Sequence, residues 1–442
     1  MEDELRDLVE AEDLGAVRRW LGDRPPHEVA AELGRLDQPA MALPFRLLEK
    51  DRALEVFEEL DPVHQQCVLD GLRDHAFREL VEGMDPDDRA RMLAEAPATV
   101  VRRVLAGLSP GERRTTAALL GYPEGSVGRV MTPEVVWVHP WQTVAEALAT
   151  VRRRGADAET VYTLPVIDTG RRLLGVVSLR TLVLSGTEER LEDLVNTEVP
   201  SVAATDEAEG AARLMQEADL LGLPIVDSEQ RLVGLLTVDD AIEVIEEADT
   251  EDVERQAAAS PLGRPYLAAS VIALARSRLP WLLLLIVAAT MTVNVLTFFE
   301  ASLAEVTALA LFIPLITGTG GNAGSQSATS IVRALAVGDV RFGDLPKVLW
   351  REGRVGLMLG VALATIGVVV CTLFAGWRLG LVVALSLIAV CTWAAIVGGG
   401  MPLLAKKIGV DPAVVSAPMV TTLVDATGLI IYFLTAHLVL GL

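Results

Sequence analysis

Long apolar segments are confined to the part of the chain after residue 265. Hydropathy gives five of them, each long enough to cross the hydrocarbon core of a bilayer: Leu279–Phe299, Ala304–Val332, Val355–Trp377, Leu379–Leu404 and Ala413–Leu440. Before residue 265, apolar residues recur at helical or strand spacing between polar ones, which is typical of water-soluble domains. The pattern predicts a multidomain protein in which a polytopic all-α membrane domain, residues 266–442, follows a soluble part.

The first 128 residues contain an internal repeat. Three segments end in Asp61-Pro62, Asp85-Pro86 and Ser109-Pro110, with the prolines 24 residues apart. Asp or Ser before Pro is typical of a helix N-cap followed by the first helical residue. The repeat predicts short helices stacked into a small solenoid-like domain. For the acids Asp85, Asp87 and Asp88, capping is favoured over cation binding on sequence alone, because acids stabilise a helix N-terminus.

Residues 129–240 contain a longer duplication. Leu164-Pro-Val-Ile-Asp168 recurs 59 residues later as Leu223-Pro-Ile-Val-Asp227, and Leu173-Leu-Gly-Val-Val-Ser178 recurs as Leu232-Val-Gly-Leu-Leu-Thr237. Each copy predicts a helix, a strand, a polar turn, a second strand and a second helix. The sequence therefore predicts a tandem α/β module.

Charge divides the chain at the same place as hydropathy. Residues 1–265 carry 53 of the 60 acids and 28 of the 38 basic residues, a net charge of −25, whereas the remainder has a net charge of +3. An acidic excess of this size favours bound cations and argues against nucleic acid as a partner. It is most concentrated between Val238 and Gln256, where nine acids accompany one base, Arg255. Residues 241–265 are predicted to form an acidic connecting helix that needs cations or a basic partner, with a solvated linker as the alternative.

The basic residues of the membrane part predict its orientation. They lie on the same side of the five predicted spans as the acidic soluble part, apart from Arg378. The positive-inside rule places that side in the cytoplasm, so the N-terminus is expected in the cytoplasm and the C-terminus outside. We expect a multi-pass protein of a bacterial-type cell membrane.

A lone carboxylate, Asp425, lies in the middle of the last apolar segment. A charge at bilayer depth is costly and normally faces a protein interior or water, so Asp425 is the first candidate for a functional residue. The alternative is a structural hydrogen bond to Thr421, Thr422 or Thr427. The second segment contains a run of Gly, Ser, Thr, Asn and Gln between Pro314 and Gln326 that indicates tight helix packing, a local break or a pore lining.

The duplicated module resembles tandem CBS domains over about 120 residues. The resemblance implies that an adenine nucleotide, such as ATP, could bind there, at Tyr162, Arg180, Thr237 and Asp240. Thr237 and Asp240 keep the hydroxyl-to-carboxylate spacing expected of such sites, whereas the first copy has Ser178 and Thr181 instead.

Domain order and two membrane motifs together resemble the MgtE magnesium channel family over essentially the whole chain. The motifs are Gly-Gly-Asn-Ala-Gly-Ser-Gln at residues 320–326 and Thr-Thr-Leu-Val-Asp-Ala-Thr-Gly at residues 421–428. The resemblance implies a homodimer with an Mg²⁺ pore on its axis, closed when cytosolic Mg²⁺ binds the acidic soluble region and the connecting helix. This chain departs from the family pattern at Ala417-Pro418, where an Asn is expected before the proline.

The resemblance also assigns site residues. The implied pore ligands are Asp425, Asn322, Gly318, Gly321 and Thr421. The implied regulatory Mg²⁺ ligands are Asp85, Asp87, Asp88, Asp219, Asp240, Asp249, Glu251, Asp252 and Asp411. Mg²⁺ keeps several of its waters and uses few carboxylates, which suits such a site.

Three other functions were considered. One is a transporter of another divalent cation, such as Co²⁺ or Mn²⁺. Another is an anion transporter, against which Asp425 argues because anion pores use Arg or Lys. The third is a membrane-anchored sensor that conducts nothing and would not need a polar second span. An enzyme is not expected, because the chain shows no phosphate-binding loop and no nucleophile with a partner base.

Overall fold

A computed structural model describes residues 4–442 except 12, 73, 97, 264, 265, 267, 268 and 416. The chain divides into two compact units, one comprising Met1–Ala248 with Arg264–Ala268 and the other Asp249–Gly263 with Ala269–Leu442. We call them the soluble unit and the membrane unit. The end expected for the connecting helix, Pro265, lies outside the described residues.

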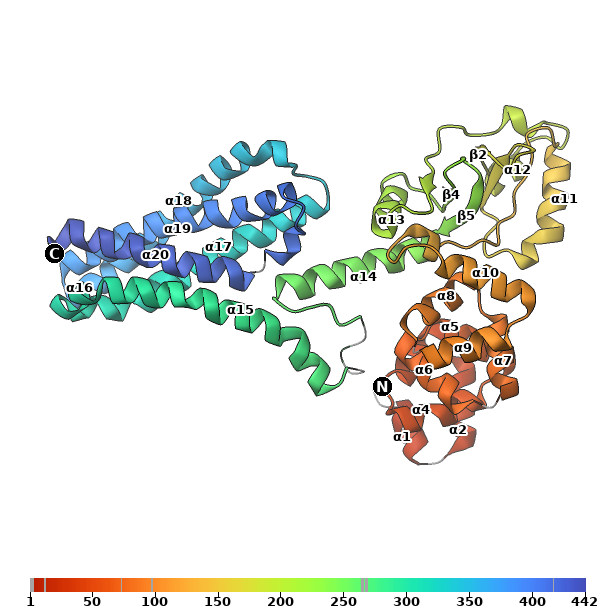
Figure 1. Ribbon diagram of the computed structural model, residues 1–442, viewed down its shortest axis with the longest axis horizontal. Coiled ribbons are helices and arrows are strands. Elements are labelled where there is room, and N and C mark those ends of the chain that lie inside the picture. Colours follow the sequence, from red (N-terminus) through yellow and green to blue (C-terminus); the bar gives the residue numbers. More distant parts are fainter. Residues whose placement is uncertain are drawn as a thin grey trace. The chain divides into compact units, whose positions relative to one another are not determined.

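Ten short helices form the helical-repeat region of the soluble unit (Figure 1). They are α1 (Glu4–Glu10), α2 (Leu14–Asp23), α3 (Pro26–Leu33), α4 (Gln38–Leu47), α5 (Lys50–Glu58), α6 (Pro62–Gly71), α7 (Asp74–Gly83), α8 (Pro86–Glu95), α9 (Ala98–Gly107) and α10 (Pro110–Leu120). One apolar core runs through them from Leu5 to Leu108, as expected where no single repeat can bury its own apolar face.

All three expected N-cap positions are confirmed, at Asp61, Asp85 and Ser109, each followed by proline as the first helical residue. The Asp61 carboxylate accepts the backbone N–H groups of Val63 and His64, and the Ser109 hydroxyl accepts that of Glu112. The Asp85 side chain makes no such bond to α8. Its carboxylate is therefore left for other partners.

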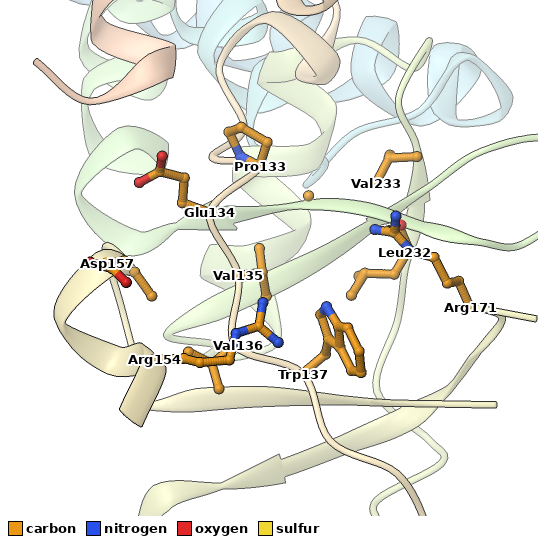
Figure 2. Close-up of a pocket in the computed structure, with 12 residues that line it drawn as sticks. Pro133, Glu134, Val135, Val136, Trp137, Arg154, Asp157, Arg171, Leu232 and Val233 are labelled. Atoms are coloured by element: carbon orange, nitrogen blue, oxygen red, sulfur yellow. Dashed lines mark hydrogen bonds between the residues drawn. The ribbon is translucent and has the colours of Figure 1, made fainter. Parts of the chain in front are cut away.

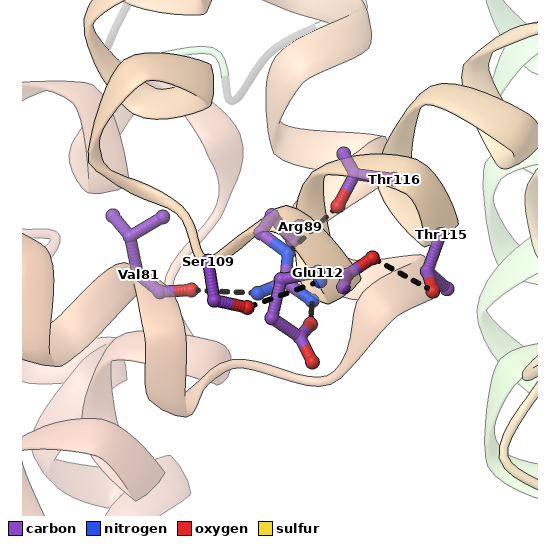
Figure 3. A network of polar contacts seen from close by, with 7 residues as sticks. Val81, Arg89, Ser109, Glu112, Thr115 and Thr116 are labelled. Carbon is purple, nitrogen blue, oxygen red and sulfur yellow. Dashed lines mark hydrogen bonds and ion pairs between the residues drawn. The ribbon is translucent and has the colours of Figure 1, made fainter.

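A buried arginine joins the last repeats (Figure 3). Arg89 of α8 is fully buried, and its guanidinium donates to Thr116 Oγ1 at 3.0 Å, to the Val81 carbonyl at 3.1 Å and to the Glu112 carboxylate. A buried charge is tolerated only when it is paired and hydrogen-bonded in this way. The network fixes α8 against α10, and in the described contacts the Arg89 guanidinium makes no bond to the acids at the start of α8.

The α/β module consists of two matching hairpins with helices α11 (Val144–Arg154), α12 (Leu179–Leu184) and α13 (Ala208–Glu217). Strands β1 (Thr163–Ile167) and β2 (Leu173–Ser178) are antiparallel, as are β4 (Gly222–Val226) and β5 (Leu232–Thr237). The short β3 (Val202–Ala203) pairs with β4 in parallel. Both hairpins have the same register and a bulge at the equivalent position, which confirms the duplication at a spacing of 59 residues.

Equivalent glycines allow a neighbouring segment to approach each hairpin. A Cβ at Gly234 would lie 2.6 Å from Met131 Sδ, and one at Gly175 would collide with the Asn196 carbonyl. These positions flank the bridges Thr132↔Leu235 and Val176↔Asn196. The segment before each copy of the module is thereby held against a hairpin.

The connecting helix, α14 (Val238–Gln256), begins directly after β5. It starts three residues before the limit expected at residue 241, because its first turn still packs on the module through Ala241. In sequence, the helix passes from the soluble unit into the membrane unit at residues 248–249.

The membrane unit contains α15 (Val271–Phe298), α16 (Glu300–Glu305), α17 (Ile313–Ala336), α18 (Leu345–Ala375), α19 (Trp377–Lys407) and α20 (Ala417–Leu440) (Figure 1). In the described part of the chain, four helices are long and apolar enough to cross a membrane: α15, α18 with the turn before it, α19 and α20. The remaining predicted span corresponds to α17, which has 24 residues but many polar ones.

The start and the continuity of that second span differ from expectation. It begins at Ile313 and not at Ala304, because α16 ends at Glu305 and a 3-10 turn fills Thr307–Phe312. The glycine-rich run lies inside one unbroken helix, so a local break is wrong and close packing is correct. Cβ atoms at Gly320 and Gly321 would lie 2.6 Å from Val390 and 2.7 Å from Thr421, so the glycines admit α19 and α20 to close contact.

Candidate cation sites

Asp425 lies in α20 with one carboxylate oxygen, Oδ1, buried and without a hydrogen-bond partner among the described residues. The three nearby threonines donate instead to carbonyls of their own helix: Thr421 to Ala417 at 2.9 Å, Thr422 to Pro418 at 2.8 Å and Thr427 to Leu423 at 2.9 Å. The structural bond considered for Asp425 is thus absent from the described contacts. A partnerless buried carboxylate is suited to receive a cation or its water.

One turn before Asp425, the hydroxyl of Thr421 lies 3.0 Å from that of Ser325 on α17. Thr421 also packs on Gly321, so the glycine-rich helix and the Asp425 helix meet here. Helix α17 also presents small or polar residues at every fourth position, and these are exposed in the single chain: Gly318, Asn322 and Gln326. A polar stripe of this kind is unfavourable against lipid, which indicates that it faces water or protein.

A cluster of three carboxylates joins α8, the loop before β1 and α14. Ligand atoms of Asp87, Glu159 and Asp240 all lie within 4.8 Å of one another. Asp87 is 5% exposed, and Asp87 Oδ1 and Glu159 Oε2 are buried without hydrogen-bond partners in the described part of the chain. We call it the inner acid cluster.

The inner acid cluster is electrostatically unfavourable as it stands. The pKa of Asp240 is raised to about 8, mainly by burial and then by the neighbouring Glu159 charge, although a 2.5 Å bond from Thr237 Oγ1 opposes the rise. Burial likewise raises the pKa of Glu159 to about 7. The pKa of Asp87 is raised by burial and then by the charges of Asp240 and Glu159. A bound divalent cation would remove this repulsion.

A second group, the outer acid cluster, consists of Glu58, Asp85 and Asp88, again with ligand atoms within 4.8 Å. Burial, followed by the charges of Asp85 and Asp88, raises the pKa of Glu58 to about 8. Burial raises the pKa of Asp88 to about 6, and Arg91 opposes that rise. Arg91 also pairs with Glu243 of α14, so this base is shared and leaves the cluster short of positive charge.

Two of these six ligands, Glu58 and Glu159, were missed by sequence reasoning. Glu58 belongs to the repeated Phe-Glu-Glu-Leu-Asp-Pro segment, where only the residue before proline had a recognisable role. Glu159 lies in an irregular loop with no motif. Only the tertiary fold brings either residue to the predicted acids.

The acids of the membrane unit have a different environment. Arg255 bonds both Glu251 and Asp411, with each N···O distance 2.6 Å. Asp249 lies 3.3 Å from Arg333 at the end of α17. Three expected regulatory ligands therefore already contact an arginine, and the two other expected ligands, Asp219 and Asp252, belong to neither acid cluster of the described chain.

The expected nucleotide residues fall into two groups. Tyr162 is 63% exposed, and its carbonyl accepts the N–H of Leu179, next to Arg180. Thr237 is buried and its hydroxyl is bonded to Asp240 within the inner acid cluster. Among the described residues, no hydrogen bond or ion pair joins the first group to the second.

Comparison with protein-family models gives three matches along the chain. Residues 24–125 match the MgtE intracellular N domain, and residues 127–185 and 191–247 match the CBS domain. Residues 313–435 match a model described as a divalent cation transporter, MgtE. The three matches follow the order of the helical repeats, the α/β module and the membrane helices.

Known proteins match over nearly the whole length. The magnesium transporter MgtE of Thermus thermophilus is 39% identical over 99% of this chain and 98% of its own. That of Bacillus subtilis is 32% identical over 94% of this chain and 92% of its own. A crystal structure of the cytosolic domain of the Mg²⁺ channel MgtE in complex with ATP is 36% identical, with a TM-score of 0.52, over 55% of this chain and 100% of that one.

Proposed function

Because the chain belongs to the MgtE family, as a multi-pass membrane protein with CBS domains, we propose that it passes Mg²⁺ into the cytoplasm along a path centred on Asp425. The observation that carries the proposal is the buried, partnerless carboxylate oxygen of Asp425 beside the polar face of α17. Both magnesium transporters named above support Mg²⁺ as the ion.

The path takes its ligands from α17 and α20. Asp425 supplies the charge, and Asn322 and Thr421 supply neutral oxygens. Gly318 leaves open space on the face of Asn322, and Gly321 admits Thr421 to close contact. Mg²⁺ gives up its waters reluctantly, so these groups act mainly through water. The exposed polar stripe of α17 needs a second wall, and a second copy of the chain around a common axis provides it. The soluble unit then lies on the cytoplasmic side, as the basic residues indicate.

The gate consists of the acidic groups of the soluble unit and of α14. Without Mg²⁺, the carboxylates of the inner and outer acid clusters repel one another, and this repulsion adds to burial in raising their pKa values. With Mg²⁺ bound, α8, the loop at Glu159 and the start of α14 are bridged. Binding closes the pore only to the extent that the closed state binds Mg²⁺ more tightly, so two clusters together shift the gate more than one.

Flux into proteoliposomes tests the pore. Wild-type Mg²⁺ flux should fall as Mg²⁺ on the regulatory side rises from micromolar to millimolar, and Asp425→Ala should abolish flux at every concentration. Asp339→Asn removes an exposed acid of the membrane unit and is the matched control, with flux expected to stay near the wild type. Normal flux through Asp425→Ala would refute the central site.

The same assay separates the alternatives. Flux of Co²⁺ or Mn²⁺ exceeding that of Mg²⁺ would point to a transporter of another divalent cation. No flux of any cation would favour a sensor that conducts nothing.

The α/β module is also proposed to bind an adenine nucleotide, with Tyr162, Arg180, Thr237 and Asp240 as the expected contacts. The related cytosolic domain in complex with ATP supports this part. Equilibrium binding of ATP to the full chain, compared between wild type and Arg180→Gln, tests it.

A further inference from the structure

The exposed face of α18 changes from basic to apolar within one helical turn. The opposite face packs on α19 through Gly356 and Gly360, where an added Cβ would lie 2.8 Å from Thr392 Cα and 2.7 Å from Ile388 Cα. Residues three or four apart share a face of a helix, so the exposed face contains three bases followed by apolar side chains. They are Lys347, Arg351 and Arg354, then Leu357, Met358 and Val361. Such a face matches a molecule with an anionic head and apolar chains.

Two tryptophans place the basic part of this face at the edge of the bilayer. Trp350 is 69% exposed near the start of α18, and Trp377, which is 65% exposed, follows its end. The helix has 31 residues and is therefore about 45 Å long, close to the thickness of a bilayer with its headgroup regions. Exposed tryptophan at both ends is typical of the aromatic belts at headgroup depth. Arg351 and Arg354, within about one turn of Trp350, therefore lie at the depth of the lipid phosphates.

The two arginines of this face are not neutralised by acids of the described chain. Neither Arg351 nor Arg354 forms an ion pair with a carboxylate of a described residue. Glu352 lies between them in sequence but is turned to the packed side of the helix. Its Oε2 accepts the Ser327 hydroxyl at 2.7 Å, and a Cβ at Gly399 would lie 2.8 Å from its Cγ. The positive charge on the exposed face is therefore left for a group from outside the chain.

A comparison with the soluble unit shows what is distinctive about this arginine and tryptophan. There, the Arg154 guanidinium lies 5.0 Å from the centroid of the Trp137 ring, in a cavity of about 460 Å³ that Glu134 and Asp157 also line (Figure 2). Arg354 lies 5.6 Å from the centroid of the Trp350 ring, on an exposed helix face. Stacking occupies only the plane of a guanidinium, so its N–H donors stay available for phosphate oxygens.

The apolar continuation of the face favours a lipid over an acidic protein surface. Leu357, Met358 and Val361 are 45%, 73% and 45% exposed and follow the arginines toward the middle of the helix. Acyl chains cover these side chains while the phosphate meets the bases, whereas an acidic protein surface would neutralise the bases and leave the apolar part unfilled. Lys347, which is bonded to Asp344 at 3.0 Å, adds a further base on the side away from the hydrocarbon.

We infer that this face of α18 binds an anionic phospholipid of the bilayer, with its phosphate on Arg351 and Arg354 beside Trp350 and its acyl chains along Met358. The inference goes beyond the proposed ion path, which takes its ligands from α17 and α20. A free phosphate ion would use the arginines alone, so the lipid is the ligand that uses the whole face.

Quenching of Trp350 fluorescence by brominated lipids tests the inference. The full chain is reconstituted in metal-free buffer into mixed bilayers of phosphatidylcholine and phosphatidylglycerol, with the acyl chains of one or the other lipid brominated. The chain has seven tryptophans, so the Trp350 signal is the difference between each protein and its Trp350→Phe form. We expect Trp350 to prefer phosphatidylglycerol about tenfold in the wild type, because each base near the surface attracts an anionic lipid. Arg351→Gln/Arg354→Gln should remove the preference.

Two further variants make the comparison specific. Arg276→Gln/Arg278→Gln removes two exposed bases of α15 and is the charge-matched control, which should keep the preference measured at Trp350. Arg351→Lys/Arg354→Lys keeps the charge and should keep most of the preference. In every variant, quenching by brominated phosphatidylcholine reports that Trp350 still faces lipid, so a variant that fails to fold is recognised.

Four results would overturn the inference. One is equal quenching of wild-type Trp350 by the two lipids. Another is the same loss of preference in the α15 control, which would indicate a general effect of surface charge. A third is the absence of quenching by either lipid, which would show that protein covers this face. The last is a preference abolished by excess inorganic phosphate at constant ionic strength, which would identify a site for free anions.

Discussion

The candidate carboxylates of the soluble unit and those of the membrane unit have opposite electrostatic surroundings. In the inner acid cluster, Asp87, Glu159 and Asp240 face one another, and their pKa values are raised. In the membrane unit, Glu251 and Asp411 share the guanidinium of Arg255, and Asp249 contacts Arg333. A carboxylate paired with its own arginine is already neutralised, whereas the inner acid cluster has no such partner among the described residues. If the proposed gate is correct, the inner cluster should respond to Mg²⁺ and the arginine pairs should not.

The largest expected effect comes from Arg89, which is fully buried in the soluble unit. Arg89→Met should lower the free energy of unfolding of this unit by about 3 kcal/mol, because the Glu112 carboxylate and the Val81 carbonyl lose their donors. Urea titration of the full chain in detergent measures it. Arg102→Met, at an exposed arginine bonded within its own helix, should change stability by less than about 0.5 kcal/mol. Equal effects of both substitutions would show that the Arg89 network contributes no more to the free energy of unfolding than an exposed arginine does.

A pH dependence is expected next in size. Because the pKa values of Glu58 and Asp240 are raised to about 8 and that of Glu159 to about 7, the folded chain binds more protons than the unfolded chain above about pH 4. Without Mg²⁺, stability should therefore fall as pH rises from about 4 to about 8. Saturating Mg²⁺ should flatten this fall. Stability that rises over the same interval in metal-free buffer would contradict the raised pKa values.

Removing a carboxylate of the inner acid cluster should weaken the response to Mg²⁺. In Asp240→Asn, the Mg²⁺ concentration for half-maximal thermal stabilisation should rise about tenfold, equivalent to about 1.4 kcal/mol. Asp219→Asn provides a matched control, since Asp219 belongs to neither cluster, and it should stay within about twofold of the wild type. If Asp219→Asn raised this Mg²⁺ concentration more than Asp240→Asn did, Asp219 and not Asp240 would be the regulatory ligand.

The smallest effect should come from the arginine pairs of the membrane unit. The side chains of Arg255, Glu251 and Asp411 are 33%, 39% and 35% exposed, so solvent screens the pairs and each stabilises by at most about 1 kcal/mol. In Arg255→Gln, closing the pore should need about two to five times more Mg²⁺, read from the flux assay. Arg354→Gln, which removes an exposed arginine beside Trp350, should leave the Mg²⁺ dependence unchanged. No shift in Arg255→Gln would show that the pairs do not hold the gate.

The fold was predictable where local patterns determine it. Proline spacing gave the helical repeats, and the 59-residue duplication gave the paired hairpins, because both signals lie within short segments. The start of α17 was missed because residues 304–312 are apolar like the helix that follows, and hydropathy does not register the turn after Glu305.

The candidate sites were predictable only in part. Asp87 and Asp240 were named through the family resemblance, whereas Glu58 and Glu159 join the two acid clusters through the tertiary fold, which no local pattern encodes. The same limit applies to Arg255 and Arg333, whose acid partners Asp411 and Asp249 are distant in sequence. Asp425 was identifiable because the cost of a charge at bilayer depth singles out one residue. The pore and regulatory assignments themselves stay predictions until flux and binding are measured.

The glycines of the membrane unit constrain how such a path can move. A methyl group at Gly360 would lie 2.7 Å from Ile388 Cα, and one at Gly398 would collide with the Gly324 carbonyl, so backbone lies against backbone from α18 through α19 to α17. Surfaces this close cannot slide past one another without separating. Mechanically, the three helices act as one block, and any opening must carry them together. The chain can then bend where it leaves this block, at the reversal after α19, where Gly409 has a φ of +77° before α20 begins.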